Sequence, residues 1–241
     1  MTPQNLMLLP LSTPKLSIGC PILDGYLGGG IPCNSITELV GESGSGKTQL
    51  CLQLTTYVHG VHDAKQLIHV LRDIQAFIVI DHTRLPVKLI VIDSIAAFFR
   101  SQYHTTLVDL KRQSKMFFKI SGTLKALANK FVLVVVVTNQ VVDFIGPHDG
   151  VNAVRLGNLE CLHTSHRRVG PTLGLAWAHC INSRVFLARH QQSVGVNSRN
   201  APSPTISSQT HRTFDLVFAP HLPHASAEFV IKKECVVGVS R

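Results

Sequence analysis

Eight consecutive residues form the clearest chemical motif of the chain. Gly41-Glu42-Ser43-Gly44-Ser45-Gly46-Lys47-Thr48 fits the pattern G-x-x-x-x-G-K-[ST] at every fixed position. Glycines let backbone N–H groups turn toward phosphate oxygens, and a helix that begins after the loop adds partial positive charge at its N-terminus. Lys47 is expected to neutralise the β- and γ-phosphates, and Thr48 to place its hydroxyl on Mg²⁺. The motif therefore predicts that all eight residues bind ATP together with Mg²⁺.

A magnesium site of this kind needs an acidic group at the end of a nearby strand. The apolar run Leu89–Ile92 ends in Asp93, and a run of the same shape, Phe77–Ile80, ends in Asp81. We favour Asp93, because a buried parallel strand that leads into a helical stretch fits its surroundings better. Asp81 is followed at once by a turn that contains proline. Thr48 and Asp93 are therefore the predicted magnesium residues, acting through the bound ATP.

A polar amide follows a third apolar run. Phe131–Thr138 is continuously apolar up to its last residue, as is typical of a strand buried on both faces of a parallel sheet. Gln140, just beyond it, is expected at the mouth of the nucleotide crevice, where ligands bind in open α/β sheets. It could sense the γ-phosphate, and a simple polar cap of the strand end explains its type equally well.

Hydrophobic spacing predicts the elements that must position these residues. A strand over Ser35–Val40 precedes the glycine loop, and a helix over Lys47–Val58 follows it. Asp63 is placed to cap a second helix, and Leu107–Lys130 has the period of a long one. Alternating strands and helices predict an α/β fold, a three-layer P-loop NTPase core with a mostly parallel sheet. We expect a single ATP-binding domain over residues 1–241.

Two stretches lack this apolar rhythm. Residues 143–171 are predicted to form a long loop, and loops of such length are usually functional. Residues 191–210, rich in Ser, Asn, Gln and Pro, are predicted to be a disordered insertion. Neither stretch contributes to the expected core.

Composition sets limits on the class of protein. The 241 residues have a formal net charge of +9 and a pI of about 9.5, which favours acidic partners such as nucleic acid or anionic membranes. Six cysteines without a C-x-x-C pair indicate a reducing compartment rather than a disulfide scaffold. The start of the chain lacks the features of a signal peptide, and the longest apolar run is too short to span a bilayer.

In combination, the motifs resemble those of RecA-type recombinases and their eukaryotic paralogues. The resemblance covers almost the whole chain and rests on LVGESGSGKTQLCLQ (39–53), LIVIDSIAAFFRSQY (89–103), VVTNQVV (136–142) and GLAWAHCINSRVFLAR (174–189). It implies ATP-dependent action on DNA in homologous recombination, in double-strand break and crosslink repair, and in meiosis, and hence a nuclear location. It also implies a heterodimer with another recombinase paralogue that assists the main recombinase.

The resemblance also implies that the predicted loop over residues 143–171 faces DNA. Its cations Arg155, Arg167 and Arg168 then become candidates for contacts with phosphates. Without the resemblance, a solvated loop explains these three residues equally well.

Two departures from the family bear on activity. The family has a strand after the P-loop helix that ends in a water-activating glutamate, and here no Glu lies between Glu42 and Glu160. We therefore assign no catalytic residue and expect ATP to act as a conformational ligand with weak or no hydrolysis; Phe77–Ile80 is a candidate replacement strand. The alternatives are an active DNA-stimulated ATPase and a non-catalytic adaptor.

The second departure concerns assembly. The family's N-terminal DNA-binding module has no counterpart, which favours a small complex over a long filament.

Overall fold

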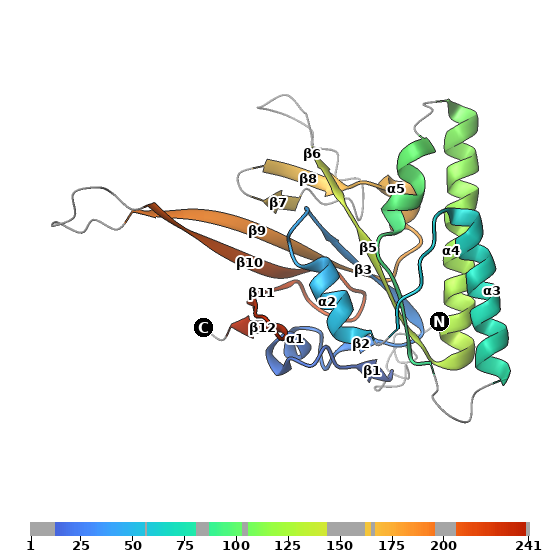
Figure 1. Ribbon diagram of the computed structural model, residues 1–241, viewed down its shortest axis with the longest axis horizontal. Coiled ribbons are helices and arrows are strands. Elements are labelled where there is room, and N and C mark those ends of the chain that lie inside the picture. The colour runs from blue at the N-terminus through green and yellow to red at the C-terminus, as the bar shows by residue number, and fades with distance from the viewer. Residues whose placement is uncertain are drawn as a thin grey trace, which may run out of the picture.

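The computed structural model describes residues 13–55, 57–80, 87–102, 106–143, 162–164, 167–195 and 206–239. Its centre is a seven-stranded sheet in the order β12-β11-β10-β9-β3-β5-β4 (Figure 1). The last four strands in this order run parallel to one another. They are β9 (Ser183–Gly195), β3 (Ser35–Gly41), β5 (Val134–Asn139) and β4 (Leu89–Ile92). The rest pair antiparallel: β10 (Ile206–Phe218), β11 (Ala225–Ile231) and β12 (Val236–Val239). The predicted α/β core is confirmed.

Helices cover both faces of the sheet and complete the three layers. Alternation along β3 sends Ile36 into a cluster with α3 (Ala64–Ile80), α4 (Leu107–Phe131) and α5 (Gly174–Ala178). It sends Leu39 to the opposite face, where α1 (Pro21–Tyr26) and α2 (Lys47–Leu54) pack. Every residue of β5 is buried, as the continuous apolar run predicts. None of the helices in the described ranges has the length and apolarity needed to span a bilayer.

The segment Phe77–Ile80 is not a strand, and the prediction that it replaces one is wrong. It forms the last turn of α3, which Asp63 caps by accepting hydrogen bonds from the N–H groups of Lys65 and Gln66 at 2.7 and 2.8 Å. Four apolar residues are too few to show the period of a strand or a helix. Phe77–Ile80 therefore continues the helix α3, whose buried face is defined by the residues before it. That face comprises Ala64, Leu67, Ile68, Leu71 and Ile78. Consequently β4 is the last strand at its edge of the described sheet.

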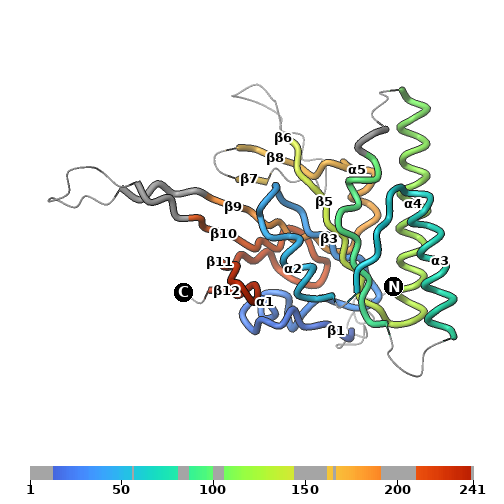
Figure 2. The backbone as a smooth tube through the Cα atoms, in the orientation of Figure 1, coloured from blue at the N-terminus to red at the C-terminus, as the bar shows by residue number. Residues whose placement is uncertain are grey.

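Strands also occupy parts of the two stretches predicted to be irregular. β6 (Val141–Asp143), β7 (Leu162–Thr164) and β8 (Arg167–Pro171) form a small antiparallel sheet in the order β6-β8-β7. β9 and β10 pair as far as Gly195 and Ile206, so the ends of the expected disordered insertion are strand (Figure 1). The coloured parts of these two strands lie side by side in Figure 2. Pairing with a neighbouring strand therefore stabilises β-structure in these segments, although their polar sequences have no apolar pattern. Residues 144–161 and 196–205 lie outside the described part.

A buried ion pair lies beneath the carboxyl end of the sheet. Arg184 Nε donates to Glu38 Oε2 at 2.7 Å, and the two side chains are 1% and 0% exposed. Glu38 Oε1 accepts from Asn139 Nδ2 at 2.8 Å and from Trp177 Nε1 at 2.9 Å. The network links β3, β5, β9 and α5, and so fixes the relative positions of the strands that end at the glycine loop. A paired and hydrogen-bonded arrangement is the condition under which a buried charge is tolerated.

We expect Glu38→Gln to lower the free energy of unfolding by about 3 kcal/mol, because it leaves the Arg184 charge buried without its counter-charge. Urea unfolding of the purified chain measures the change. Glu234→Gln, at an exposed position in the turn between β11 and β12, is the matched control, with an expected effect within about 0.5 kcal/mol. Equal effects of the two substitutions would contradict a role for the network in stability.

Candidate nucleotide-binding site

The glycine loop joins the end of β3 to the start of α2 in the predicted strand–loop–helix order. Gly44 and Gly46 have φ of +74° and +111°, a region that favours glycine. A Cβ at Gly41 would lie 2.4 Å from the Leu187 carbonyl oxygen, and one at Gly46 would lie 3.0 Å from Ile231 Cδ1. The loop is therefore packed against β9 and β11, and its shape depends on these three glycines.

Lys47 directs its charge into this loop. Its side chain is buried, and Nζ donates to the carbonyl oxygens of Gly41 and Glu42 at 2.8 and 2.9 Å. Burial lowers the pKa of Lys47, while the nearby Asp93 opposes that shift. The Ser45 hydroxyl is also buried, with no hydrogen-bond partner among the described residues. A buried cation and an unsatisfied hydroxyl within a ring of backbone N–H groups fit phosphate oxygens.

Asp93 lies beside Thr48, as its position after β4 predicts. Thr48 Oγ1 donates to Asp93 Oδ2 at 2.7 Å, and Thr138 Oγ1 donates to Asp93 Oδ1. β4 pairs in parallel with β5, so the carboxyl ends of both strands meet at one edge of the sheet. A hydroxyl next to a carboxylate supplies the oxygen ligands that Mg²⁺ prefers, with the remaining positions left to water and phosphate. The rival Asp81 lies outside the described residues.

Gln140 lies directly after β5, at the same edge. Its N–H donates to Asn139 Oδ1 at 2.8 Å, and its carbonyl accepts from the Thr172 N–H at 2.9 Å. These bonds fix the backbone of Gln140 between β5 and the start of the small β6–β8 sheet. A phosphate-sensing role for its side chain stays a prediction.

Of the three predicted DNA-contacting arginines, Arg167 and Arg168 lie on opposite faces of β8. Arg167 Nη2 lies 2.7 Å from Glu42 Oε2 in the glycine loop, and its Nη1 lies 3.2 Å from Asp143 Oδ1. Arg168, the next residue of β8, points to the opposite face of the strand and pairs in register with His163 of β7. Arg155 lies outside the described residues. Contacts of these arginines with DNA stay a prediction.

Sequence reasoning missed two sets of residues that shape the site. Thr138 was treated only as the end of an apolar run, although a hydroxyl opposite a strand-end aspartate is a signal that register alone could have supplied. The partners of Glu38, by contrast, are 101 to 146 positions away along the chain. No local pattern predicts contacts of that separation.

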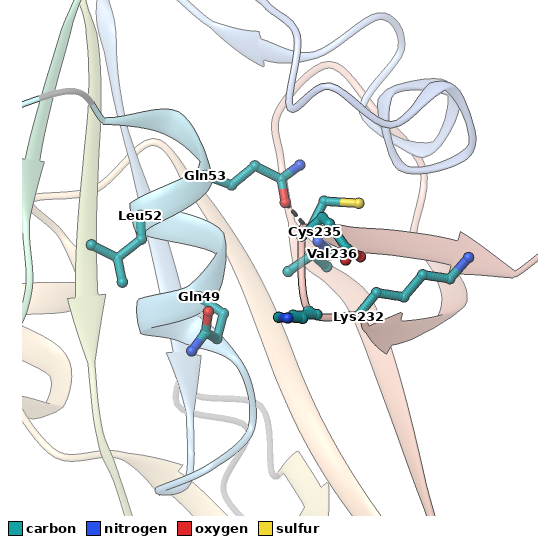
Figure 3. Close-up of a pocket in the computed structure, with 8 residues that line it drawn as sticks. Gln49, Leu52, Gln53, Lys232, Cys235 and Val236 are labelled. Atoms are coloured by element: carbon teal, nitrogen blue, oxygen red, sulfur yellow. Dashed lines mark hydrogen bonds between the residues drawn. The ribbon is translucent and has the colours of Figure 1, made fainter.

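A pocket lies between α2 and the turn that joins β11 to β12 (Figure 3). Gln53 ties α2 to the facing turn, because its Oε1 accepts from the Val236 N–H at 2.7 Å. Gln49, which also lines the pocket, is the residue directly after Thr48. The full lining comprises Gln49, Leu52, Gln53, Lys232, Lys233, Glu234, Cys235 and Val236.

A glycine loop between β3 and α2, with an aspartate at the end of β4 reaching its threonine, defines a RecA-like P-loop NTPase core. The Rad51 family model matches residues 12–63 and 58–169. A DNA repair protein XRCC3 homolog from Arabidopsis thaliana is 40% identical, with 98% of this chain and 97% of that protein covered. The chain belongs to the Rad51 family, and membership implies a nucleotide-binding core.

Two further relatives extend the comparison. DNA repair protein XRCC3 of Mus musculus is 28% identical over 93% of this chain and 75% of its own length. DNA repair protein rhp57 of Schizosaccharomyces pombe is 26% identical, with 90% of this chain and 77% of that protein covered.

The alignment with the Arabidopsis protein spans 296 positions, at least 296 − 241 = 55 more than this chain can fill. The two family matches meet at residues 58–63, after α2. Both observations agree with the predicted absence of a family segment there.

We expect Thr138→Val to raise, by about ten-fold, the Mg²⁺ concentration needed for half-maximal nucleotide binding, because it removes a hydrogen bond that orients the Asp93 carboxylate. Thr138→Ser keeps the hydroxyl and is expected to behave as the wild type. Titration of a fluorescent ATP analogue at a series of Mg²⁺ concentrations measures the effect. Indistinguishable curves for the valine and serine variants would refute the orienting role.

Proposed function

We propose that this chain binds ATP with Mg²⁺ at the loop Gly41–Thr48. The observation that carries the proposal is the joint placement of Lys47, Thr48 and Asp93, three groups that meet around one glycine loop. Lys47 neutralises phosphate charge, and Thr48 with Asp93 holds the metal through the nucleotide and water.

ATP acts here as a conformational ligand, and hydrolysis is weak or absent. No Glu lies between Glu42 and Glu160 in the sequence, and the alignment with the Arabidopsis relative has at least 55 positions that this chain does not fill. α3 runs through Phe77–Ile80, so that segment forms no replacement strand. A bound nucleotide can still favour one conformation, because only a difference in affinity between two states is required.

The cellular role that the comparisons favour is DNA repair by homologous recombination, as a recombinase paralogue in the nucleus. The relatives are DNA repair proteins by name, and the Arabidopsis protein aligns along almost the whole chain. The partners are DNA, single-stranded or branched, and a second recombinase paralogue that forms a heterodimer with this chain to assist the main recombinase in break and crosslink repair and in meiosis. The net charge of +9 suits an anionic partner.

Nucleotide binding is tested by thermal unfolding with and without MgATP. At a hundred times its dissociation constant, ATP is expected to add about 2.7 kcal/mol to the free energy of unfolding. Lys47→Ala should abolish the shift because it removes the buried cation that faces the phosphates, and Lys65→Ala, exposed on α3, should keep it. The absence of a shift in the wild type would refute the proposed ATP site.

DNA binding is tested at Arg168. Arg168→Ala is expected to weaken binding of single-stranded DNA and to reduce the slope of log K against log salt by about 0.7, the loss of one phosphate contact. Lys111→Ala, at an exposed position on α4, is the matched control. An unchanged slope for the Arg168 variant, or an equal change for both variants, would count against a DNA-facing β8.

A further inference from the structure

The second residue of the glycine loop, Glu42, is held by the small β6–β8 sheet. Thr164 Oγ1 donates to Glu42 Oε1 at 2.7 Å, and Arg167 Nη2 donates to Glu42 Oε2 at 2.7 Å. The Glu42 side chain is only 14% exposed, whereas that of Arg167 is 52% exposed. Both oxygens of the carboxylate therefore bond to groups of a different sheet, far away in the sequence.

The two groups that hold Glu42 are built as one unit. Thr164 and Arg167 are directly paired between β7 and β8. Leu162 and Val169, the next pair on the same face of the small sheet, are buried with residues of β3 and β9, among them Phe186. The small sheet is thus anchored on the main sheet, and it presents the hydroxyl and the guanidinium to Glu42 from a fixed position.

Arg167 also reaches the third strand of the small sheet. Its Nη1 lies 3.2 and 3.4 Å from the two carboxylate oxygens of Asp143, in β6. One guanidinium therefore joins the glycine loop to β6 as well as β8. Its neighbour Arg168 lies on the opposite face of the same strand.

Glu42 is also in contact with the phosphate-binding cation. Its backbone carbonyl accepts a hydrogen bond from Lys47 Nζ at 2.9 Å. A phosphate that attracts the Lys47 ammonium weakens the hydrogen bond from Lys47 Nζ to the Glu42 carbonyl. The side chain of Glu42 is meanwhile held by Thr164 and Arg167. A shift of the loop at this residue and a shift of the β6–β8 sheet therefore depend on each other.

We propose that Arg167 is a positioning residue for the nucleotide site. Through Glu42 it fixes the first turn of the glycine loop, and it couples nucleotide binding to the position of the β6–β8 sheet. The proposal rests on the proposed ATP site and adds a regulatory contact to it. Coupling between sites is reciprocal, so any ligand that displaces the β6–β8 sheet changes nucleotide affinity by the same factor as nucleotide changes the affinity for that ligand.

The contact is tested first without nucleotide, by hydrogen exchange of the full chain. Arg167→Gln is expected to speed exchange of the amides in residues 43–48 and in β8, because the loop loses its tie to the small sheet. Lys111→Gln, at an exposed position on α4, is the control and is expected to exchange as the wild type does. Unchanged exchange in the Arg167 variant, or equal changes in both, would overturn the proposal whether or not ATP binds.

Coupling is tested next with a fluorescent ATP analogue and a double-mutant cycle. Glu42→Gln and Arg167→Gln are each expected to weaken binding by about five-fold, the low end for coupled sites, because the pair is partly exposed. The double variant is expected to lose about five-fold as well, and Arg167→Lys to recover part of the loss. Losses that multiply in the double variant would refute the coupling. A wild type that binds no analogue refutes the ATP site instead, and the exchange experiment then still decides on the contact.

Discussion

The backbone conformation of the glycine loop is the constraint on which the rest of this structure depends. Phosphate binding requires several N–H groups to converge in front of a helix, which places glycines at positive φ and brings their Cα atoms against neighbouring strands. β9 and β11 pack against Gly41 and Gly46, so those strands must lie where the loop allows. The buried Glu38–Arg184 pair keeps β3 and β9 in that register. Fold and site are therefore specified by the same contacts.

The local parts of the site could be predicted from the sequence. A glycine loop between a β-branched strand and a helix is a short-range pattern, and Asp93 follows an apolar run that has the length of one strand. The same reasoning failed at Phe77–Ile80, because four apolar residues suit the end of an amphipathic helix as well as a strand. It could not find the contact between Glu42 and Arg167, which are 125 positions apart. Such contacts depend on tertiary packing.

The shortened core changes how the family's architecture is used. The alignment with the Arabidopsis relative is at least 55 positions longer than this chain, and the two family matches meet after α2. α3, which follows, packs against α4 and the face of the sheet below β4 and β5. The elements that carry Lys47, Thr48, Asp93 and Gln140 are all present, namely α2 and the ends of β4 and β5, whereas no Glu lies between Glu42 and Glu160. Binding and turnover therefore depend on different parts of the fold, and a chain can keep the first without the second.

β4 is the last strand at one edge of the described sheet, and its unpaired side has a consequence for solubility. An open edge offers N–H and C=O groups to any passing extended chain, which is the first step of sheet-to-sheet polymerisation. Here the edge is only four residues long, and Ile90 and Ile92 are buried rather than presented outward. So short a template offers few ladder bonds to a second molecule. The edge of the described sheet therefore gives little support to the first step of polymerisation.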